Sequence, residues 1–283
     1  MKIIVYHKGG FGNQLYQFAL AKYLSSYYDA ELICDITYFK VDIFVGNTHR
    51  NFELNKIFSN LNVRSSFYTL IFNFLALKYL RNNRSFFYLT DNNFKSNMNL
   101  FEFKKVKYLI LNGYFQNNNN ILKQIDHFIY SKINIFNSNY IIDHKTSLCI
   151  HIRKGDYLKY ENIYTNLTPS YYFNGIRYLN NKYKINHVIY IFTDNINWVK
   201  LNILNNKLYN YKIISTNSTI EDFRLLSTFK KVIISNSTFS LWSTYLTLKD
   251  KIDVIAPQKW YVDYSKNIDF IDNNLPKSFI LLN

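Results

Sequence analysis

The chain begins with a short strand, a glycine-rich turn, a helix and a second strand, and this order constrains its fold more than any other feature. Residues 2–6 and 31–36 are apolar runs of strand length. Residues 13–28 place apolar and aromatic side chains at helical spacing. A strand, a helix and a strand in this order form a parallel pair, so the sequence predicts an α/β fold with parallel sheets.

The rest of the chain repeats this alternation. Strands are predicted at residues 107–111, 147–152, 188–193, 212–215, 232–235 and 253–256, and helices at residues 121–132, 169–181, 220–227 and 239–248. Polar residues 137–146 separate the halves. We therefore expect two lobes, residues 1–143 and 144–283, with a site in the cleft between them and with a C-terminal tail that can pack back on the first lobe.

Composition and charge narrow the class of protein. Hydrophobic residues make up 48% of the chain, which excludes a disordered protein. Cys34 and Cys149 both lie in apolar runs, which indicates reduced core thiols in a cytosolic protein. A net charge of +15 calls for an acidic partner: nucleic acid, a phosphorylated small molecule or an anionic membrane. No RNA-binding or zinc-ligand pattern occurs, so we expect no nucleic-acid partner.

The sequence predicts a cytoplasmic protein. The N-terminus has no signal-peptide pattern. The longest uncharged apolar run, residues 65–77, is shorter than the ~20 residues that span a bilayer. We expect a buried helix there. The alternative is an interfacial helix, because basic residues follow it, and this would place the protein peripherally on the inner face of the plasma membrane.

A predicted anion site follows the strand at residues 147–152. Alternation puts His151 and Arg153 on the same face, and the segment continues as Lys154, Gly155 and Asp156. In open α/β sheets, ligands bind at the carboxyl ends of strands.

The turn before the first helix offers a second candidate. Gly10 and Gly12 expose backbone at a helix N-terminus, and Asn13 and Gln14 add amide groups. Leu15 occupies the position of the third glycine in a dinucleotide-binding fingerprint, so we do not expect NAD or FAD.

Two further strand ends carry polar residues. Asp194 and Asn195 follow the strand at 188–193, and Ser237, Thr238 and Ser240 open the helix after the strand at 232–235. Helix capping explains part of this hydroxyl density, but a helix N-terminus also favours a diphosphate. The three strand ends therefore predict one ligand that carries both anionic and hydroxyl groups.

Four segments, in order, carry a resemblance to a known family. They are GGFGNQLYQFALAKYL, HIRKGDY, YIFTDNINWVK and ISNSTFSLWSTYL, at residues 9–24, 151–157, 190–200 and 234–246. The chain resembles the bacterial α-1,2-fucosyltransferases of glycosyltransferase family 11, and HIRKGDY is also akin to the motif of α-1,6-fucosyltransferases.

The resemblance implies a GT-B fold, with an acceptor lobe at residues 1–143 and a GDP-fucose lobe at 144–283. It implies inverting transfer of L-fucose from GDP-β-L-fucose to the 2-hydroxyl of a β-galactoside, without a metal or other cofactor. The absence of an Asp-x-Asp triplet agrees with the last point. The acceptor would be a β-galactoside or lipid-linked oligosaccharide of O-antigen synthesis. Another linkage, such as α-1,6, and a non-catalytic basic membrane-surface or nucleic-acid-binding protein remain alternatives.

The resemblance also assigns residues. Arg153 would neutralise the departing phosphate and His151 would shape the pocket beside it. Lys154 stands where the family usually has a second arginine, which puts its contact with phosphate in doubt. The predicted donor-site residues are Gly10, Gly12, Asn13, Gln14, His151, Arg153, Lys154, Asp194, Ser237, Thr238 and Ser240.

Two acids compete for the role of general base. Asp156 belongs to the HIRKGDY motif and is the first choice, and Glu161 lies at the spacing of the base in the α-1,6 relatives. The alternative role for Asp156 is to orient His151 or Arg153 as a buried acid. The base must lie within hydrogen-bond distance of the acceptor hydroxyl, and sequence spacing alone cannot show which of the two acids does.

Overall fold

The computed structural model describes residues 1–41, 50–65, 85–94, 103, 105–116, 128–129, 131–132, 147–184 and 188–283. The chain divides into two compact units, Met1–Lys132 and Ile133–Asn283. Residues 133–146, which contain the predicted lobe boundary, lie outside the described residues. Each unit is described by itself.

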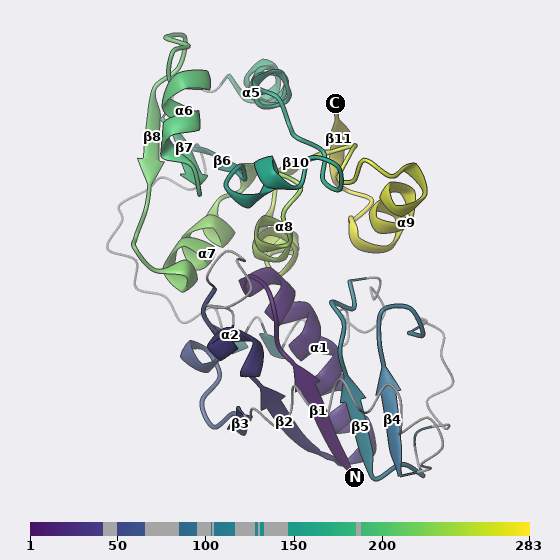
Figure 1. Cartoon of the computed structure of the whole chain (residues 1–283). Coiled ribbons are helices and arrows are strands. Elements are labelled where there is room, and N and C mark those ends of the chain that lie inside the picture. Colours follow the sequence, from purple (N-terminus) through teal and green to yellow (C-terminus); the bar gives the residue numbers. More distant parts are fainter. Residues whose placement is uncertain are drawn as a thin grey trace. The chain divides into compact units, whose positions relative to one another are not determined.

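The first unit contains a five-stranded parallel sheet in the order β3-β2-β1-β5-β4 (Figure 1). Its strands are β1 Lys2–Tyr6, β2 Glu31–Asp35, β3 Val63–Arg64, β4 Phe86–Leu89 and β5 Tyr108–Leu111. Its described helices are α1 Phe11–Tyr28, α2 Thr37–Val41 and the 3-10 helix η2 Leu54–Lys56. β1 is central because it pairs with both β2 and β5.

Helix α1 starts from the predicted glycine turn. Gly9 has φ +76°, a conformation that glycine adopts without strain, and extended Gly10 is the N-cap. The helix packs against β1 and β2, and residues such as Leu15, Leu20 and Leu24 are buried. It ends at Asp29, whose left-handed conformation stops the helix.

The second unit contains a six-stranded parallel sheet in the order β11-β10-β9-β6-β7-β8. Its strands are β6 Leu148–Ile152, β7 Ile189–Thr193, β8 Tyr211–Ile214, β9 Lys231–Ile233, β10 Asp253–Pro257 and β11 Ile280–Leu282. Its helices within the described residues are α5 Pro169–Tyr183, α6 Ile196–Asn202, α7 Thr219–Thr228, α8 Thr238–Tyr245 and α9 Tyr264–Asn274, with the 3-10 helices η5 Asp156–Lys159 and η6 Leu248–Asp250.

Both faces of this sheet are covered (Figure 1). Leu148, Ile150 and Ile152 pack with α5 and α6 on one face. Cys149 packs on the other face with residues of α7, α8 and α9. The alternation predicted for β6 is therefore confirmed, and His151 and Arg153 lie on the face of Cys149.

The predicted fold class, α/β with two parallel-sheet units, is confirmed. The last strand, β11, forms a parallel pair with β10 at the edge of the second sheet. Both cysteines are free and buried, as expected.

The membrane expectations are tested only in part. No helix within the described ranges combines the length and apolar character that crossing a membrane requires. Most of the run at residues 65–77 lies outside the described residues, as does most of the predicted helix at 121–132.

Candidate functional site

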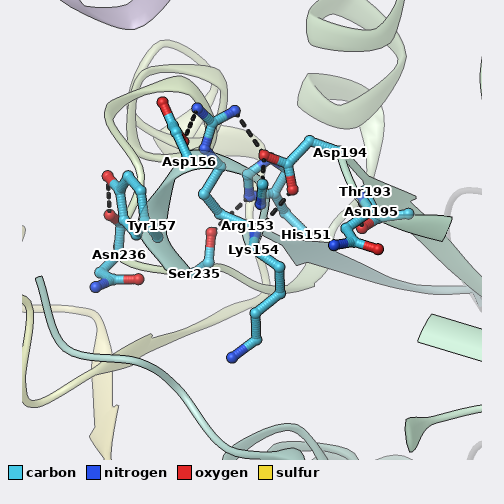
Figure 2. A network of polar contacts seen from close by, with 11 residues as sticks. His151, Arg153, Lys154, Asp156, Tyr157, Thr193, Asp194, Asn195, Ser235 and Asn236 are labelled. Carbon is cyan, nitrogen blue, oxygen red and sulfur yellow. Dashed lines mark hydrogen bonds and ion pairs between the residues drawn. The ribbon is translucent and has the colours of Figure 1, made fainter. Parts of the chain in front are cut away.

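The three predicted polar strand ends are neighbours in the second sheet. β6 lies between β7 and β9, and all three strands run parallel. Their carboxyl ends therefore meet at one edge of the sheet, where Arg153, Asp194 and Asn236 follow them (Figure 2). The predicted convergence of the strand ends is confirmed.

Arg153 is held by two carboxylates from different parts of the chain. Its Nη2 lies 2.5 Å from Oδ1 of Asp156, and its Nη1 lies 2.9 Å from Oδ2 of Asp194. Figure 2 shows the guanidinium between the two acids. Burial lowers the pKa of Arg153, but Asp194 and Asp156 outweigh this effect and raise it. The arginine is therefore a permanent cation in a fixed orientation.

This cation remains reachable from solvent. The side chains of Arg153, Asp156 and Asp194 are 18%, 19% and 26% exposed. A guanidinium has five N–H donors, and the two ion pairs leave others for an incoming anion. The arrangement can bind a phosphate and stabilise negative charge that develops on it.

Asp194 joins the ends of β6 and β7. Besides Arg153, its carboxylate accepts hydrogen bonds from the main-chain N–H groups of Lys154, at 2.8 Å, and Gly155, at 3.1 Å. A Cβ on Gly155 would come within 2.7 Å of Oδ2 of Asp194. An alanine at this position would therefore force the Asp194 carboxylate to shift. Asn195, the next residue, is the N-cap of α6 and accepts from the N–H of Trp198 at 2.9 Å.

His151 is a buried and neutral neighbour of Arg153. Its Nδ1 lies 2.8 Å from Oγ of Ser235, and its ring stacks on Phe239 at 5.5 Å. Burial lowers the pKa of His151 from 6.5 to about 3, while Asp194 raises it and Arg153 lowers it further. The imidazole therefore lies buried behind Arg153 and adds no charge at neutral pH.

Lys154 points away from the arginine (Figure 2). Its ammonium group donates to Oδ1 of Asn166 and to the main-chain oxygen of Leu167. It also lies 4.4 Å from the centre of the Trp198 ring. The structure therefore engages Lys154 inside the protein, where its predicted contact with phosphate would require these bonds to break.

The connection between β6 and α5 carries both candidate bases. Asp156 faces Arg153, whereas Glu161 is exposed and its Oε1 accepts from Nδ2 of Asn166 at 2.8 Å. The Tyr157 ring stacks on Tyr164 at 4.3 Å. The two acids thus occupy different environments on one loop.

Asn236 anchors this loop from the end of β9. Its Nδ2 donates to the main-chain oxygens of Thr165, at 2.9 Å, and Trp260, at 3.0 Å. Its own main-chain oxygen accepts from the hydroxyl of Tyr157 at 2.9 Å. The buried amide therefore ties the loop to the sheet edge.

The predicted hydroxyl residues lie at the start of α8. Ser237 is the N-cap but makes no side-chain cap hydrogen bond, and Thr238 is the first helical residue. Ser240 is fully buried, and its hydroxyl donates to the main-chain oxygen of Ser237 at 3.2 Å. Ser237 and Thr238 therefore lie at the helix N-terminus, whereas the hydroxyl of Ser240 is used within the helix.

The glycine-turn residues belong to the first unit. Gly10 precedes α1, and a Cβ on it would meet nothing within 4 Å. Gly12 lies within the first turn of α1 and is buried. Oδ1 of Asn13 accepts from Gln116 at 3.0 Å. Gln14 is fully buried and bonds main-chain groups of Gly9, Asn51 and Glu53. Gln14 is therefore a structural support, and Gly10 leaves open space in front of the helix.

Sequence reasoning missed several residues of this site. They are Ser235, Asn236, Asn166 and Trp198, which hold His151, the loop and Lys154. Ser235 and Asn236 stand within the segment at residues 234–246, and this is the one signal that pointed to them. Among the described residues, no three His, Cys, Asp or Glu side chains gather in a way that can hold a metal ion.

Comparisons with known proteins place this chain in a family. A model of glycosyl transferase family 11 matches residues 5–274. The O-antigen biosynthesis glycosyltransferase WbnK of Escherichia coli is 30% identical over 92% of this chain and 95% of that protein. An alpha-1,2-colitosyltransferase of Escherichia coli is 36% identical over 41% of each chain.

Solved structures give weaker likenesses. FUT1 of Arabidopsis thaliana in complex with GDP covers 87% of this chain and 68% of that chain, with 13% identity and a TM-score of 0.47. Fucosyltransferase NodZ from Bradyrhizobium covers 86% of this chain and 92% of that chain, with 11% identity and a TM-score of 0.42. The family model and WbnK each match most of the chain. The protein therefore belongs to glycosyl transferase family 11.

Proposed function

We propose that this glycosyltransferase moves L-fucose from GDP-β-L-fucose to the 2-hydroxyl of a β-galactoside, with inversion at the anomeric carbon. The observation that carries the proposal is Arg153, fixed by Asp156 and Asp194 at the carboxyl end of β6. A permanently charged, oriented guanidinium suits a nucleotide diphosphate, because it can meet two phosphate oxygens at once.

The reaction is a single displacement. The acceptor oxygen forms a bond to the anomeric carbon of fucose while the bond from that carbon to the β-phosphate oxygen breaks. GDP leaves with the bonding electrons, and Arg153 stabilises the charge that grows on it. The hydroxyl proton passes to a carboxylate. The product is an α-L-fucoside.

For the proton acceptor we favour Glu161 over our first choice, Asp156. Asp156 lies 2.5 Å from Arg153, which suits an acid that orients the guanidinium. Glu161 is exposed, and the amide of Asn166 contacts its Oε1. An exposed carboxylate outside the arginine ion pairs is better placed to take a proton from an acceptor hydroxyl.

We also propose that no metal takes part. Arg153 supplies the positive charge that a divalent ion would otherwise bring to the diphosphate. EDTA should therefore leave turnover unchanged, and loss of activity that only added Mg²⁺ or Mn²⁺ restores would contradict this part of the proposal.

A second donor is favoured by one relative. Because the 36% identical stretch belongs to an alpha-1,2-colitosyltransferase, colitose is the alternative sugar. The name of WbnK further suggests an O-antigen oligosaccharide as acceptor.

We also propose that the enzyme lies peripherally on the inner face of the plasma membrane, because its net charge of +15 favours an anionic surface. Co-sedimentation with lipid vesicles tests the membrane location: the protein should sediment with vesicles that contain anionic lipid and not with neutral vesicles.

One experiment tests the function. The protein is incubated with GDP-fucose, or with the colitosyl nucleotide, and a panel of terminal galactosides, and the product linkage is determined. An α-1,2-fucoside is expected. An α-1,6 product, exclusive use of colitose, or release of GDP without a glycoside would each contradict the proposal in a distinct way.

A further inference from the structure

Lys154 is a buried cation whose described contacts lie within the second unit. The residue is only 2% exposed. The ammonium bonds Asn166 and Leu167, and the face of Trp198 lies 4.4 Å from it. Two of its three donors are therefore used and an aromatic ring covers the group. Little of the ammonium is left for an external phosphate.

Asn166 connects Lys154 to Glu161. Because Oδ1 of Asn166 faces the ammonium, its amide NH₂ group must face the other way, where Nδ2 donates to Glu161 at 2.8 Å. A cation imposes this orientation, since a carbonyl oxygen accepts from it and an NH₂ group cannot. The order ammonium, amide, carboxylate thus has each donor facing an acceptor.

We propose that Lys154 is a positioning residue that sets the place of the Glu161 carboxylate through Asn166 and does not bind the diphosphate. The inference rests on the proposed fucosyl transfer and on the role of Glu161 as base.

Electrostatics agree with this role. Burial lowers the pKa of Lys154 to about 8, and Glu161 and Asp194 raise it. The Lys154 side chain is thus mostly protonated at pH 7. The carboxylates of Glu161 and Asp194 are the charged groups that balance its positive charge. A buried charge needs such partners, because it has lost its hydration.

The position of Asn166 in the loop explains why its contact with Lys154 matters. The loop between β6 and α5 is held in its middle by a bridge between Tyr164 and Tyr261 and by the bond from Asn236 to Thr165. The bonds from Lys154 to Asn166 and Leu167 fix the last part of the loop before α5. Without them, Asn166, which donates to the Glu161 carboxylate, is no longer held by Lys154, and the carboxylate is less fixed relative to the sheet edge that carries Arg153.

The first test is Lys154→Met, which keeps length and removes charge. We expect turnover to fall about 10- to 100-fold, because small displacements of a catalytic group cost this much. The Kd of GDP, measured by calorimetry, should stay within about twofold. A loss of GDP affinity as large as that of Arg153→Ala would overturn the proposal. Lys182→Met, which removes an exposed lysine paired with Asp253 at 2.8 Å, is the matched control.

A double-mutant cycle separates positioning from general destabilisation. Asn166→Leu should lower turnover as Lys154→Met does. The turnover of the double variant should be no lower than that of the less active single variant, because both substitutions act through one chain of contacts. Lys154→Arg, which keeps a cation, should recover part of the turnover. Fully additive losses, or no recovery with arginine, would contradict the positioning role. Asn166→Leu and Lys154→Arg also cover the case in which Lys154→Met does not fold.

Hydrogen exchange of backbone amides tests the contact between Lys154 and Asn166 without an activity assay. In Lys154→Met, backbone amides of residues 160–165 should exchange faster than in wild type, while those of β7 stay unchanged. Unchanged exchange in residues 160–165 would overturn the proposal. Absence of turnover in the wild type, by contrast, would count against fucosyl transfer, and the exchange measurement would still decide on Lys154.

Discussion

Oδ2 of Asp194 lies 2.9 Å from Nη1 of Arg153, and the same carboxylate accepts the main-chain N–H groups of Lys154 and Gly155. One acid at the end of β7 therefore fixes both the side chain and the backbone that follow β6. The guanidinium is oriented before any ligand arrives, and such preorganisation is what makes charge stabilisation effective in catalysis.

Arg153→Ala should abolish transfer and leave the fold intact. Removal of one charge-stabilising group costs about 10²- to 10³-fold in turnover, and Arg153→Lys should recover little, because lysine lacks the fork. Turnover is measured with GDP-fucose and a galactoside. Arg177→Ala, on the exposed side of α5, is the control and should behave as wild type. Wild-type turnover in Arg153→Ala would refute the phosphate role.

Comparison of Glu161→Gln with Asp156→Asn should identify the base. We expect Glu161→Gln to lose about 10²- to 10⁴-fold in turnover, the usual contribution of a general base. Asp156→Asn should mainly weaken GDP binding, because it frees the guanidinium from one of its two carboxylates. Turnover numbers and GDP affinities are measured for both variants. A large loss of turnover in Asp156→Asn alone would return the role to Asp156.

Gly155→Ala should destabilise the second unit and weaken GDP binding. Its Cβ would lie 2.7 Å from Oδ2 of Asp194, and overpacking of this kind costs about 1–3 kcal/mol. Gly10→Ala, where a Cβ meets nothing within 4 Å, should cost less than about 1 kcal/mol as a change of N-cap. Urea denaturation compares the two variants, and equal losses would show that the contact with Asp194 does not matter.

The protein should lose stability as the pH falls from 7 to 5. Burial lowers the pKa values of His7 and His151 to about 3, well below their usual 6.5. A depressed pKa means that the unfolded chain binds more protons between pH 6.5 and 3, so stability is present above pH 6.5 and is lost below it. At pH 5 each histidine contributes a loss of roughly 2 kcal/mol.

Denaturation curves at pH 7 and pH 5 test the expected loss of stability. His151→Gln should remove about half of the histidine contribution and therefore flatten the pH dependence, although it also alters the bond to Ser235. A pH dependence that is the same in wild type and in His151→Gln would argue against a buried neutral imidazole.

Much of the fold follows from local pattern. The alternation of apolar runs and helical spacing predicted β1, β2, β6, β7 and β10 within one or two residues. The predictions missed β4, whose side chains are mostly half-buried, and α9, a largely polar helix whose buried residues include Asn267 and Asn274. These two elements form because the rest of their unit offers them a surface to pack on.

The sequence by itself determined that Arg153 and Asp194 follow parallel strands, because alternation and strand ends are local properties. It also placed His151 on the face of Arg153. Only the tertiary structure decided that β6 lies between β7 and β9, which brings those residues within bonding distance. It likewise turned Lys154 toward Asn166 and Trp198 and left Glu161 exposed. The direction of a long side chain depends on partners that lie far away in the sequence, so strand pattern alone cannot predict it.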